Sequence, residues 1–178
     1  MTESLPITYL LVLIVLLGGA SWFILRQAFK TRNTELTLVN LQRKLAQGPG
    51  SPEDYYELGS ILLNKKLYAQ SILQFQKALK SKDLESGELA GLIYNALGYG
   101  YAAQEQYDLA LRQYKEALKC APDYVVALKN MGFAYERKQL VSQAIETYEQ
   151  VLTIAPNDAV AQKRLDSLKK RMVESGAS

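Results

Sequence analysis

Histidine is absent from this sequence of 178 residues, and cysteine occurs only once, as Cys120. One cysteine cannot form a disulfide within the chain, and we expect Cys120 to be a small core residue. The lack of histidine removes the commonest general base and the commonest metal ligand. No glycine-rich phosphate loop or cluster of buried acids takes its place, so the residues that catalysis requires are missing. The sequence therefore predicts a protein that is not an enzyme and binds no metal or cofactor.

A basic surface for nucleic acid is also lacking, although the isoelectric point is near 8.8. Residues 1–50 contain five basic and two acidic side chains, whereas residues 51–178 contain sixteen of each. The net charge of +3 therefore comes entirely from the N-terminal segment. Because the larger part of the chain is neutral and has no basic stripe interleaved with aromatics, we expect no nucleic-acid partner.

The first feature that is present is a long apolar run from Leu5 to Leu25, which contains no charged residue in 21 positions. A helix of that length is roughly 30 Å long and matches the hydrocarbon thickness of a bilayer. A cleavable signal peptide is the alternative, with Gly18 and Ala20 as a small-residue cleavage site. The sequence favours a membrane anchor, because the run continues well beyond that site and no Lys or Arg precedes it.

Basic residues come directly after the apolar run, as Arg26, Lys30 and Arg32, while Glu3 lies on its N-terminal side. Under the positive-inside rule this asymmetry keeps the rest of the chain in the cytoplasm or an equivalent such as stroma. We therefore predict a single-pass anchor with a basic flank over residues 1–32.

Residues 33–51 are predicted to form a connector between the anchor and the C-terminal two thirds of the chain. Thr31 to Gln47 is a mostly polar helical stretch, which either extends the membrane helix or packs on the first repeat. Gly48-Pro49-Gly50 then interrupts any helix, because proline cannot continue the hydrogen-bond ladder and glycine weakens helical order. This break is a candidate hinge.

A 34-residue period runs through the rest of the chain. Its second and third copies share the positions Tyr94/Leu128, Leu97/Met131, Gly98/Gly132, Tyr101/Tyr135, Ala110/Ala144, Tyr114/Tyr148, Ala117/Val151 and Pro122/Pro156. A weaker first copy, with Gly59 and Phe75, is offset by 39 residues, which indicates an insertion of about five residues around Ser86 to Ala90. The period predicts helix pairs at 52–85, 91–124 and 125–158, followed by a capping helix and tail over 159–178.

Helix starts and close helix contacts can also be placed. Ser51 and Pro52 supply an N-cap and a first-turn proline, and we expect Asp123 and Asn157 to cap the corresponding later helices. Glycines 59, 98 and 132 are expected to leave room for the facing helix of each pair.

These signature residues show that residues 52–172 resemble the tetratricopeptide repeat (TPR) superfamily. The predicted fold class is all-α, with an N-terminal transmembrane helix, a three-repeat TPR solenoid and a C-terminal capping helix. The layout of the whole chain resembles the small thylakoid TPR proteins of cyanobacteria and plastids. That resemblance implies a scaffold that assists photosystem I assembly and holds its subunits or assembly intermediates as partners. It also implies a thylakoid location with the repeats on the cytoplasmic or stromal side.

The inner face of a TPR stack is lined by the first helix of each pair, and on this basis we predict a groove for a partner peptide. Its predicted residues are Tyr56, Asn64, Asn95, Tyr99, Lys129, Asn130, Phe133 and Arg137. The resemblance also weighs against the TPR domains that clamp acidic chaperone tails with Lys, Asn and Arg. The matching positions here are Tyr56, Ser60, Ala96, Val126 and Asn130.

Two other functions remain open at this point. One is a general bacterial membrane-anchored TPR adaptor in envelope biogenesis or secretion, and the other is a receptor that targets membrane proteins. All three hypotheses share the anchor and the groove and differ in the partner.

Overall fold

A computed structural model describes residues 4–85 and 87–176, and within these ranges the chain forms eight helices and no strand. Residues 1–3, which include Glu3, and residues 86 and 177–178 lie outside the described residues, as do the side chains of residues 4–11, 28–31 and 175–176, which include Lys30. The described part confirms the prediction of an all-α fold. The chain divides after Gln47 into two compact units.

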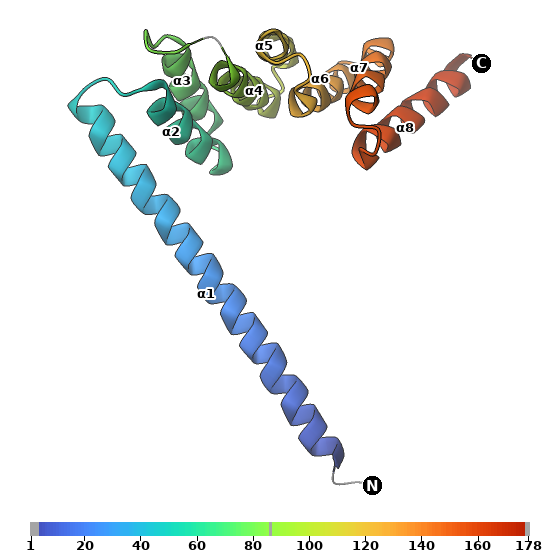
Figure 1. Cartoon of the computed structure of the whole chain (residues 1–178). Coiled ribbons are helices and arrows are strands. Elements are labelled where there is room, and N and C mark those ends of the chain that lie inside the picture. The colour runs from blue at the N-terminus through green and yellow to red at the C-terminus, as the bar shows by residue number, and fades with distance from the viewer. Residues whose placement is uncertain (1–3, 86, 177–178) are drawn as a thin grey trace. The chain divides into compact units, whose positions relative to one another are not determined.

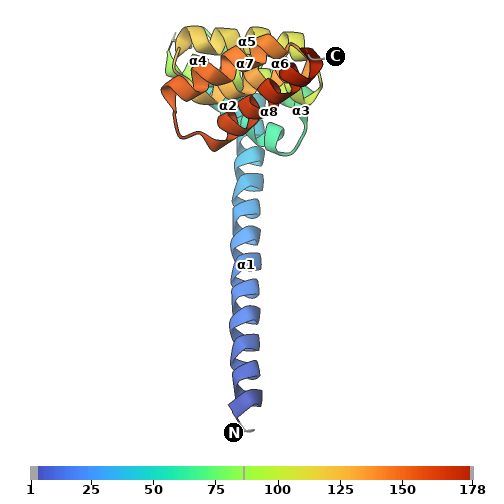
Figure 2. The same cartoon turned by 90° about the vertical axis from the view of Figure 1, so that its right-hand side faces the viewer.

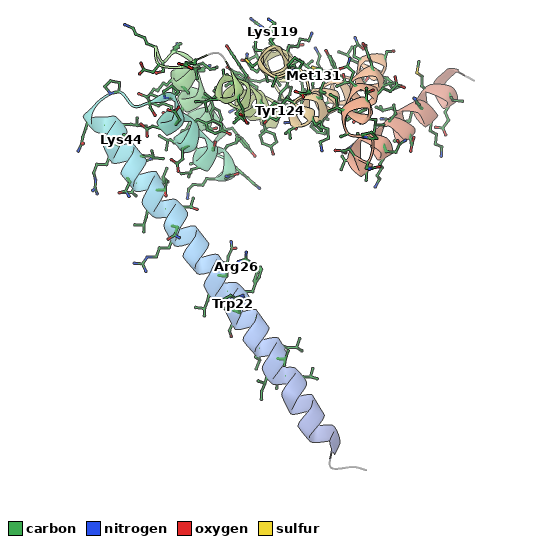
Figure 3. The ribbon with its side chains drawn as sticks, in the orientation of Figure 1. Trp22, Arg26, Lys44, Lys119, Tyr124 and Met131 are labelled. Atoms are coloured by element: carbon green, nitrogen blue, oxygen red, sulfur yellow. The ribbon has the colours of Figure 1, made fainter. Side chains whose placement is uncertain are left out.

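The first unit is a single helix, α1, which runs without interruption over Ser4–Gln47 (Figures 1 and 2). The predicted anchor and the helical part of the predicted connector are therefore one continuous helix, about 66 Å long at 1.5 Å per residue. The large apolar side chains from Val12 to Leu25 are all more than 50% exposed. Among the described residues α1 is the one helix whose length and composition suffice to cross a membrane. Trp22 and Arg26 lie one turn apart where the apolar run ends (Figure 3).

The second unit is a row of helix pairs, which Figure 1 shows side by side along the chain. The pairs are α2 Pro52–Asn64 with α3 Tyr68–Leu79, α4 Glu88–Ala103 with α5 Tyr107–Cys120, and α6 Val125–Arg137 with α7 Val141–Ile154. A last helix, α8 Ala159–Gly176, packs against α7. This is the predicted three-repeat solenoid with its C-terminal helix.

The insertion between the first two repeats is divided between a loop and a helix. Helix α4 begins at Glu88, three residues before the predicted repeat boundary at 91, and has 16 residues where α2 and α6 have 13. Part of the extra sequence thus becomes an added turn of α4. The remainder lengthens the link that follows α3.

Helix α2 begins with a complete capping box. The Ser51 hydroxyl oxygen accepts a hydrogen bond from the backbone N–H of Asp54 at 3.3 Å, and the Ser51 N–H donates to the Asp54 carboxylate at 2.9 Å. This confirms the predicted start of the first repeat.

The two later cap predictions are wrong. The N-cap of α6 is Tyr124, whose side chain makes no capping hydrogen bond, so Asp123 has no capping role. Before α8 the capping group is Asp158, one residue beyond Asn157, and its carboxylate accepts from the backbone N–H groups of Val160 at 3.1 Å and Ala161 at 2.9 Å. Proline stops a helix, but the residue that caps the next helix depends on the geometry of the turn between them.

Each repeat is closed by an aromatic ring that rests on a glycine of the partner helix. A Cβ atom at Gly59, Gly98 or Gly132 would lie 2.6, 2.6 or 2.9 Å from ring atoms of Phe75, Tyr114 or Tyr148. All three rings are at most 2% exposed, so they have no free space to move into. The glycines therefore leave room for the facing helix, as predicted.

Cys120 is half-buried at the end of α5, so it is less enclosed than the core residue we expected. Its Cβ faces Gly91 of α4, where an added Cβ would lie 3.3 Å away. The position is tight because the two helices approach closely there.

The turn inside each repeat has the same backbone shape. Lys66, Glu105 and Gln139 have φ angles of 62°, 59° and 60°, in the left-handed region that non-glycine residues rarely adopt. In each turn the N–H of the next residue donates to a carbonyl five residues earlier, at 2.9, 3.0 and 2.9 Å. This pairing satisfies carbonyls at the end of the first helix and sets the direction of the second.

Candidate partner-binding cavity

An inner cavity of about 500 Å³ lies along the first helices of the three repeats. It is lined by Tyr56, Ser60, Leu63, Asn64, Lys66, Tyr68, Asn95, Ala96, Tyr99, Val126 and Asn130. Helices α2, α4 and α6 supply most of these residues because the first helices of successive repeats form the inner face of the stack.

Two carboxamides and a phenol form a hydrogen-bonded chain beside the cavity. Asn130 donates from Nδ2 to Oδ1 of Asn95 at 2.9 Å, and Asn95 donates from Nδ2 to the Tyr124 hydroxyl at 3.3 Å. Tyr124 lies between α4 and α6 (Figure 3). The chain joins the second repeat to the third. Within the described residues, one N–H of each amide and Oδ1 of Asn130 form no hydrogen bond, so they are available to a ligand.

The environment of Tyr124 disfavours ionisation of its hydroxyl. Burial raises the pKa of Tyr124, the neighbouring Tyr56 raises it further, and the hydrogen bond from Asn95 opposes them. Because the neutral phenol keeps its proton, it can accept from Asn95 and still donate to another group.

Aromatic and apolar side chains form the exposed walls of the cavity. Tyr99 is 49% exposed and Val126 is 47% exposed, so both can contact a ligand. Tyr56 is held more firmly, since its ring centroid lies 6.0 Å from that of Phe75 in the core. Exposed aromatics beside oriented amides are suited to an extended peptide, whose backbone bonds to amides and whose side chains fill the apolar spaces.

Lys66 is the one charged residue among those that line the cavity. It is exposed, and its ammonium group forms no ion pair within the described part of the chain. A cavity with one cation and no lining carboxylate favours neutral or acidic ligand groups over basic ones.

Five of the eight predicted groove residues meet around this cavity: Tyr56, Asn64, Asn95, Tyr99 and Asn130. Leu63, Lys66, Tyr68 and Tyr124 were not predicted, because they lie on the last turn of the first helix, in the turns between helices, or at the start of a second helix. The signal that could have found Lys66 is that positions 66, 105 and 139 are separated by the same 39 and 34 residues as the repeats, so they mark the turn within each repeat.

The other three predicted residues lie outside the cavity and contact protein groups. Phe133 has the Arg164 guanidinium 6.0 Å from its ring centroid. Arg137 lies 5.6 Å from the ring centroid of Tyr107 and pairs with Glu105 at 3.4 Å.

Lys129, the last of the three, bonds to the residue that caps α8. Its Nζ lies 2.6 Å from the carboxylate of Asp158. This hydrogen bond, together with the N–H of Ala161, lowers the pKa of Asp158 below its usual value, against a small effect of burial. A carboxyl with a lowered pKa stabilises the folded state above its unfolded pKa, and this contribution is lost as the pH falls through the folded pKa. Lys129 therefore stabilises the start of α8.

Two basic residues of α8 also form contacts that stabilise the fold. Glu136, only 11% exposed, accepts a hydrogen bond from the Tyr148 hydroxyl at 2.7 Å. The same carboxylate lies 3.6 Å from Arg164 and 3.7 Å from Arg171. This cluster joins α6, α7 and α8 and gives the two arginines a structural role.

The described residues contain no arrangement suited to a metal ion. They contain no group of three or more His, Cys, Asp or Glu side chains placed to hold a metal ion. The chemistry that the cavity offers is hydrogen bonding, aromatic contact and one positive charge.

Three stacked helix pairs closed by a last helix, with a polar and aromatic cavity on the inner face, define a helical-repeat solenoid of the TPR type, a class that mediates protein–protein contacts. Family comparison finds the tetratricopeptide repeat at residues 55–83 and 127–158, and the TPR repeat at 98–139. The chain belongs to the tetratricopeptide repeat family.

Similar proteins come from photosynthetic lineages. The chain is 42% identical over 109 residues to ycf37 of Cyanophora paradoxa, a match that covers 61% of this chain and 63% of that one. It is 39% identical over 131 residues to ycf37 of Guillardia theta, covering 74% of each. It is 36% identical over 128 residues to the chloroplastic TPR protein PYG7 of Arabidopsis thaliana, covering 72% of this chain. The match thus spans less than two thirds of the Cyanophora protein, and 42% of PYG7.

Solved structures confirm the fold alone. A double mutant of MamA RS-1 aligns with a TM-score of 0.71 at 21% identity, covering 83% of this chain and 80% of that one. The Cut9–Hcn1 assembly of the APC/C gives a TM-score of 0.71 at 24% identity, covering 82% of this chain and 28% of that one.

Proposed function

We propose that this protein is a membrane-anchored scaffold that assists the assembly or stability of photosystem I through contacts made in the inner cavity. The similarity to ycf37 and to chloroplastic PYG7 carries the proposal, because it extends over about three quarters of the chain. The resemblance of the layout to small thylakoid TPR proteins supplies the assignment to photosystem I. The apolar helix α1 supports attachment to a membrane.

In this proposal the partner is an extended segment of a photosystem I subunit or assembly intermediate. Its backbone bonds to the amides of Asn95 and Asn130, and an apolar side chain rests against Tyr99. Lys66 stands beside a neutral or acidic group of the segment. Because the cavity contains no catalytic arrangement, the protein holds its partner and leaves it chemically unchanged.

The proposed location is the thylakoid, with α1 in the membrane and the repeats on the cytoplasmic or stromal side. Arg26 and Arg32 at the end of the apolar run support this side by the positive-inside rule. A scaffold placed there meets the soluble and membrane-exposed surfaces of new photosystem subunits.

The test uses a deletion strain that carries the variant Tyr99→Ala with Asn64→Ala. Loss of a central aromatic contact typically costs about 2 kcal/mol, close to a thirtyfold loss of affinity. We expect the variant to remain folded and membrane-bound while photosystem I declines relative to photosystem II in low-temperature fluorescence. The matched control is Leu73→Ala, because Leu73 is also 49% exposed but does not line the cavity.

The outcomes separate the parts of the proposal. A deletion strain with a normal ratio of the photosystems, in ordinary and in strong light, contradicts the role in photosystem I and leaves a general membrane-anchored adaptor. A deletion strain that loses photosystem I while the cavity variant restores it shows that the partner binds elsewhere on the protein.

A further inference from the structure

We propose that the end of α3, the first residues of the link that follows it and the segment that enters α2 form a second binding site, which takes an acidic segment of a partner protein. The site is a cavity of about 700 Å³ and shares no lining residue with the inner cavity. It is lined by Pro49, Gly50, Ser51, Tyr55, Lys77, Lys80, Ser81, Lys82 and Asp83. The proposal is independent of any role in photosystem I.

The cavity lies where α3 ends and the lengthened link to α4 begins. Ser81, Lys82 and Asp83 follow the last turn of α3 and line the cavity beside the segment that enters α2. Loops that depart from a regular scaffold are frequent sites of function.

Three lysines make this cavity basic. The ammonium groups of Lys77, Lys80 and Lys82 form no ion pair with any described residue, and all three side chains are exposed. Asp83 is the one acid in the lining, so the lining carries a net charge of two positive units. Lys77 and Lys80 lie at the end of α3, where the helix dipole favours cations. Lys82 lies beyond the helix, so the dipole does not account for the whole set.

Part of the site is held in place before any ligand arrives. The Nζ of Lys77 lies 5.9 Å from the ring centroid of Tyr55, a cation–π contact. The Tyr55 hydroxyl accepts a hydrogen bond from the N–H of Gly50 at 3.3 Å. Tyr55 therefore joins the entering segment, α2 and one of the lysines in one arrangement. Groups held in position lose less conformational freedom on binding.

Anionic lipid headgroups are the competing source of negative charge, and the lipid composition of nanodiscs distinguishes them from an acidic protein segment.

Isolated phosphate groups are disfavoured. Phosphate sites commonly use free N–H groups at a helix N-terminus. At α2 the Ser51 and Asp54 side chains already fill the cap, and Pro52 has no N–H. Separate lysines around an open cavity instead match carboxylates spaced along a flexible protein segment.

The experiment uses the full chain in detergent micelles and a fluorescein-labelled dodecapeptide with six glutamates. Its counterpart has glutamines in their place. We expect the glutamate peptide to bind in low salt, and the triple variant Lys77→Gln, Lys80→Gln, Lys82→Gln to bind it about tenfold more weakly or worse by anisotropy. The matched control, Arg112→Gln with Lys115→Gln and Lys163→Gln, removes the same charge outside both cavities and should stay within about twofold of the wild type.

Each other result overturns the proposal. If the glutamine peptide binds equally well, charge does not determine binding. If both triple variants weaken binding equally, the peptide is held by the overall charge of the protein and not by this cavity. Loss caused by the control alone places the acid outside this cavity. A fall in peptide affinity when anionic lipid replaces neutral lipid in nanodiscs assigns the lysines to the membrane. A single-stranded oligonucleotide of equal charge that binds as tightly assigns them to nucleic acid. Circular dichroism of each variant shows that the fold is retained.

Discussion

Replacing Gly98 by alanine tests the packing that defines each repeat. The new Cβ would lie 2.6 and 2.7 Å from two ring atoms of Tyr114, closer than real Cβ contacts come. The Tyr114 ring is 1% exposed and lies in a core of other buried side chains, so it cannot move away without disturbing them. The substitution therefore forces a shift of α4 against α5.

The expected magnitude comes from two opposing effects. Overpacking a core costs about 1 to 3 kcal/mol, and we expect a contact this short with a buried ring to cost about 3 kcal/mol. Alanine is favoured over glycine inside a helix by about 1 kcal/mol. The net loss is about 2 kcal/mol, which lowers the melting temperature of a domain this size by about 8 °C.

The assay is thermal unfolding of the full chain in micelles, followed by circular dichroism. Gly91→Ala in the same helix is the control, because its Cβ would lie 3.3 Å from the Cys120 Cβ, a contact that small shifts relieve. A double-mutant cycle with Tyr114→Leu should recover part of the loss, since the smaller side chain removes the clash. If Gly98→Ala melts at or above the wild type, or if Gly91→Ala lowers the melting temperature by as much, the ring does not rest on the glycine as described.

Two further predictions concern the ends of the molecule. Lowering the pH through the range below about 4 should destabilise the repeat unit as Asp158 takes up a proton, because its pKa is lower in the folded state. Asp158→Asn should be less stable at neutral pH and should lose part of this acid sensitivity in unfolding at several pH values, whereas an unchanged pH profile would show that the Lys129 contact does not matter. Protease added to membranes with the cytoplasmic or stromal side outward should remove the repeat unit by cutting near Gly48, and protease on the opposite side should leave it intact. Digestion only from the opposite side would reverse the proposed orientation.

The repeats could be predicted because the residues that build them recur at fixed spacing. Gly98 and Tyr114 recur as Gly132 and Tyr148, and each pair meets in the structure as the same ring on the same glycine. The local pattern and the tertiary contact agree at these positions, which is why the helix pairs can be found from one sequence.

The candidate sites were harder to predict because they depend on contacts between elements. Lys129 occupies a predicted inner-face position, but its side chain bonds to Asp158 because α8 begins beside α6. Periodicity places a residue on a face of its own helix and does not give the position of the next helix start. The second cavity is a stronger case, since its lysines Lys77 and Lys82 align with Glu116 and Ala121 of the second repeat, so the period does not indicate the charge gathered there.

In the left-handed turns inside the repeats, the backbone conformation does not depend on the chemical type of the side chain. Backbone hydrogen bonds set the same conformation at Lys66, Glu105 and Gln139, although one side chain is a cation, one an anion and one an amide. The Lys66 turn borders the inner cavity, and the Glu105 side chain lies across from Arg137 of the next repeat. Evolution can therefore change the charge beside the cavity at such a turn while the helices around it stay where they are, so related proteins can diverge in partner without diverging in fold.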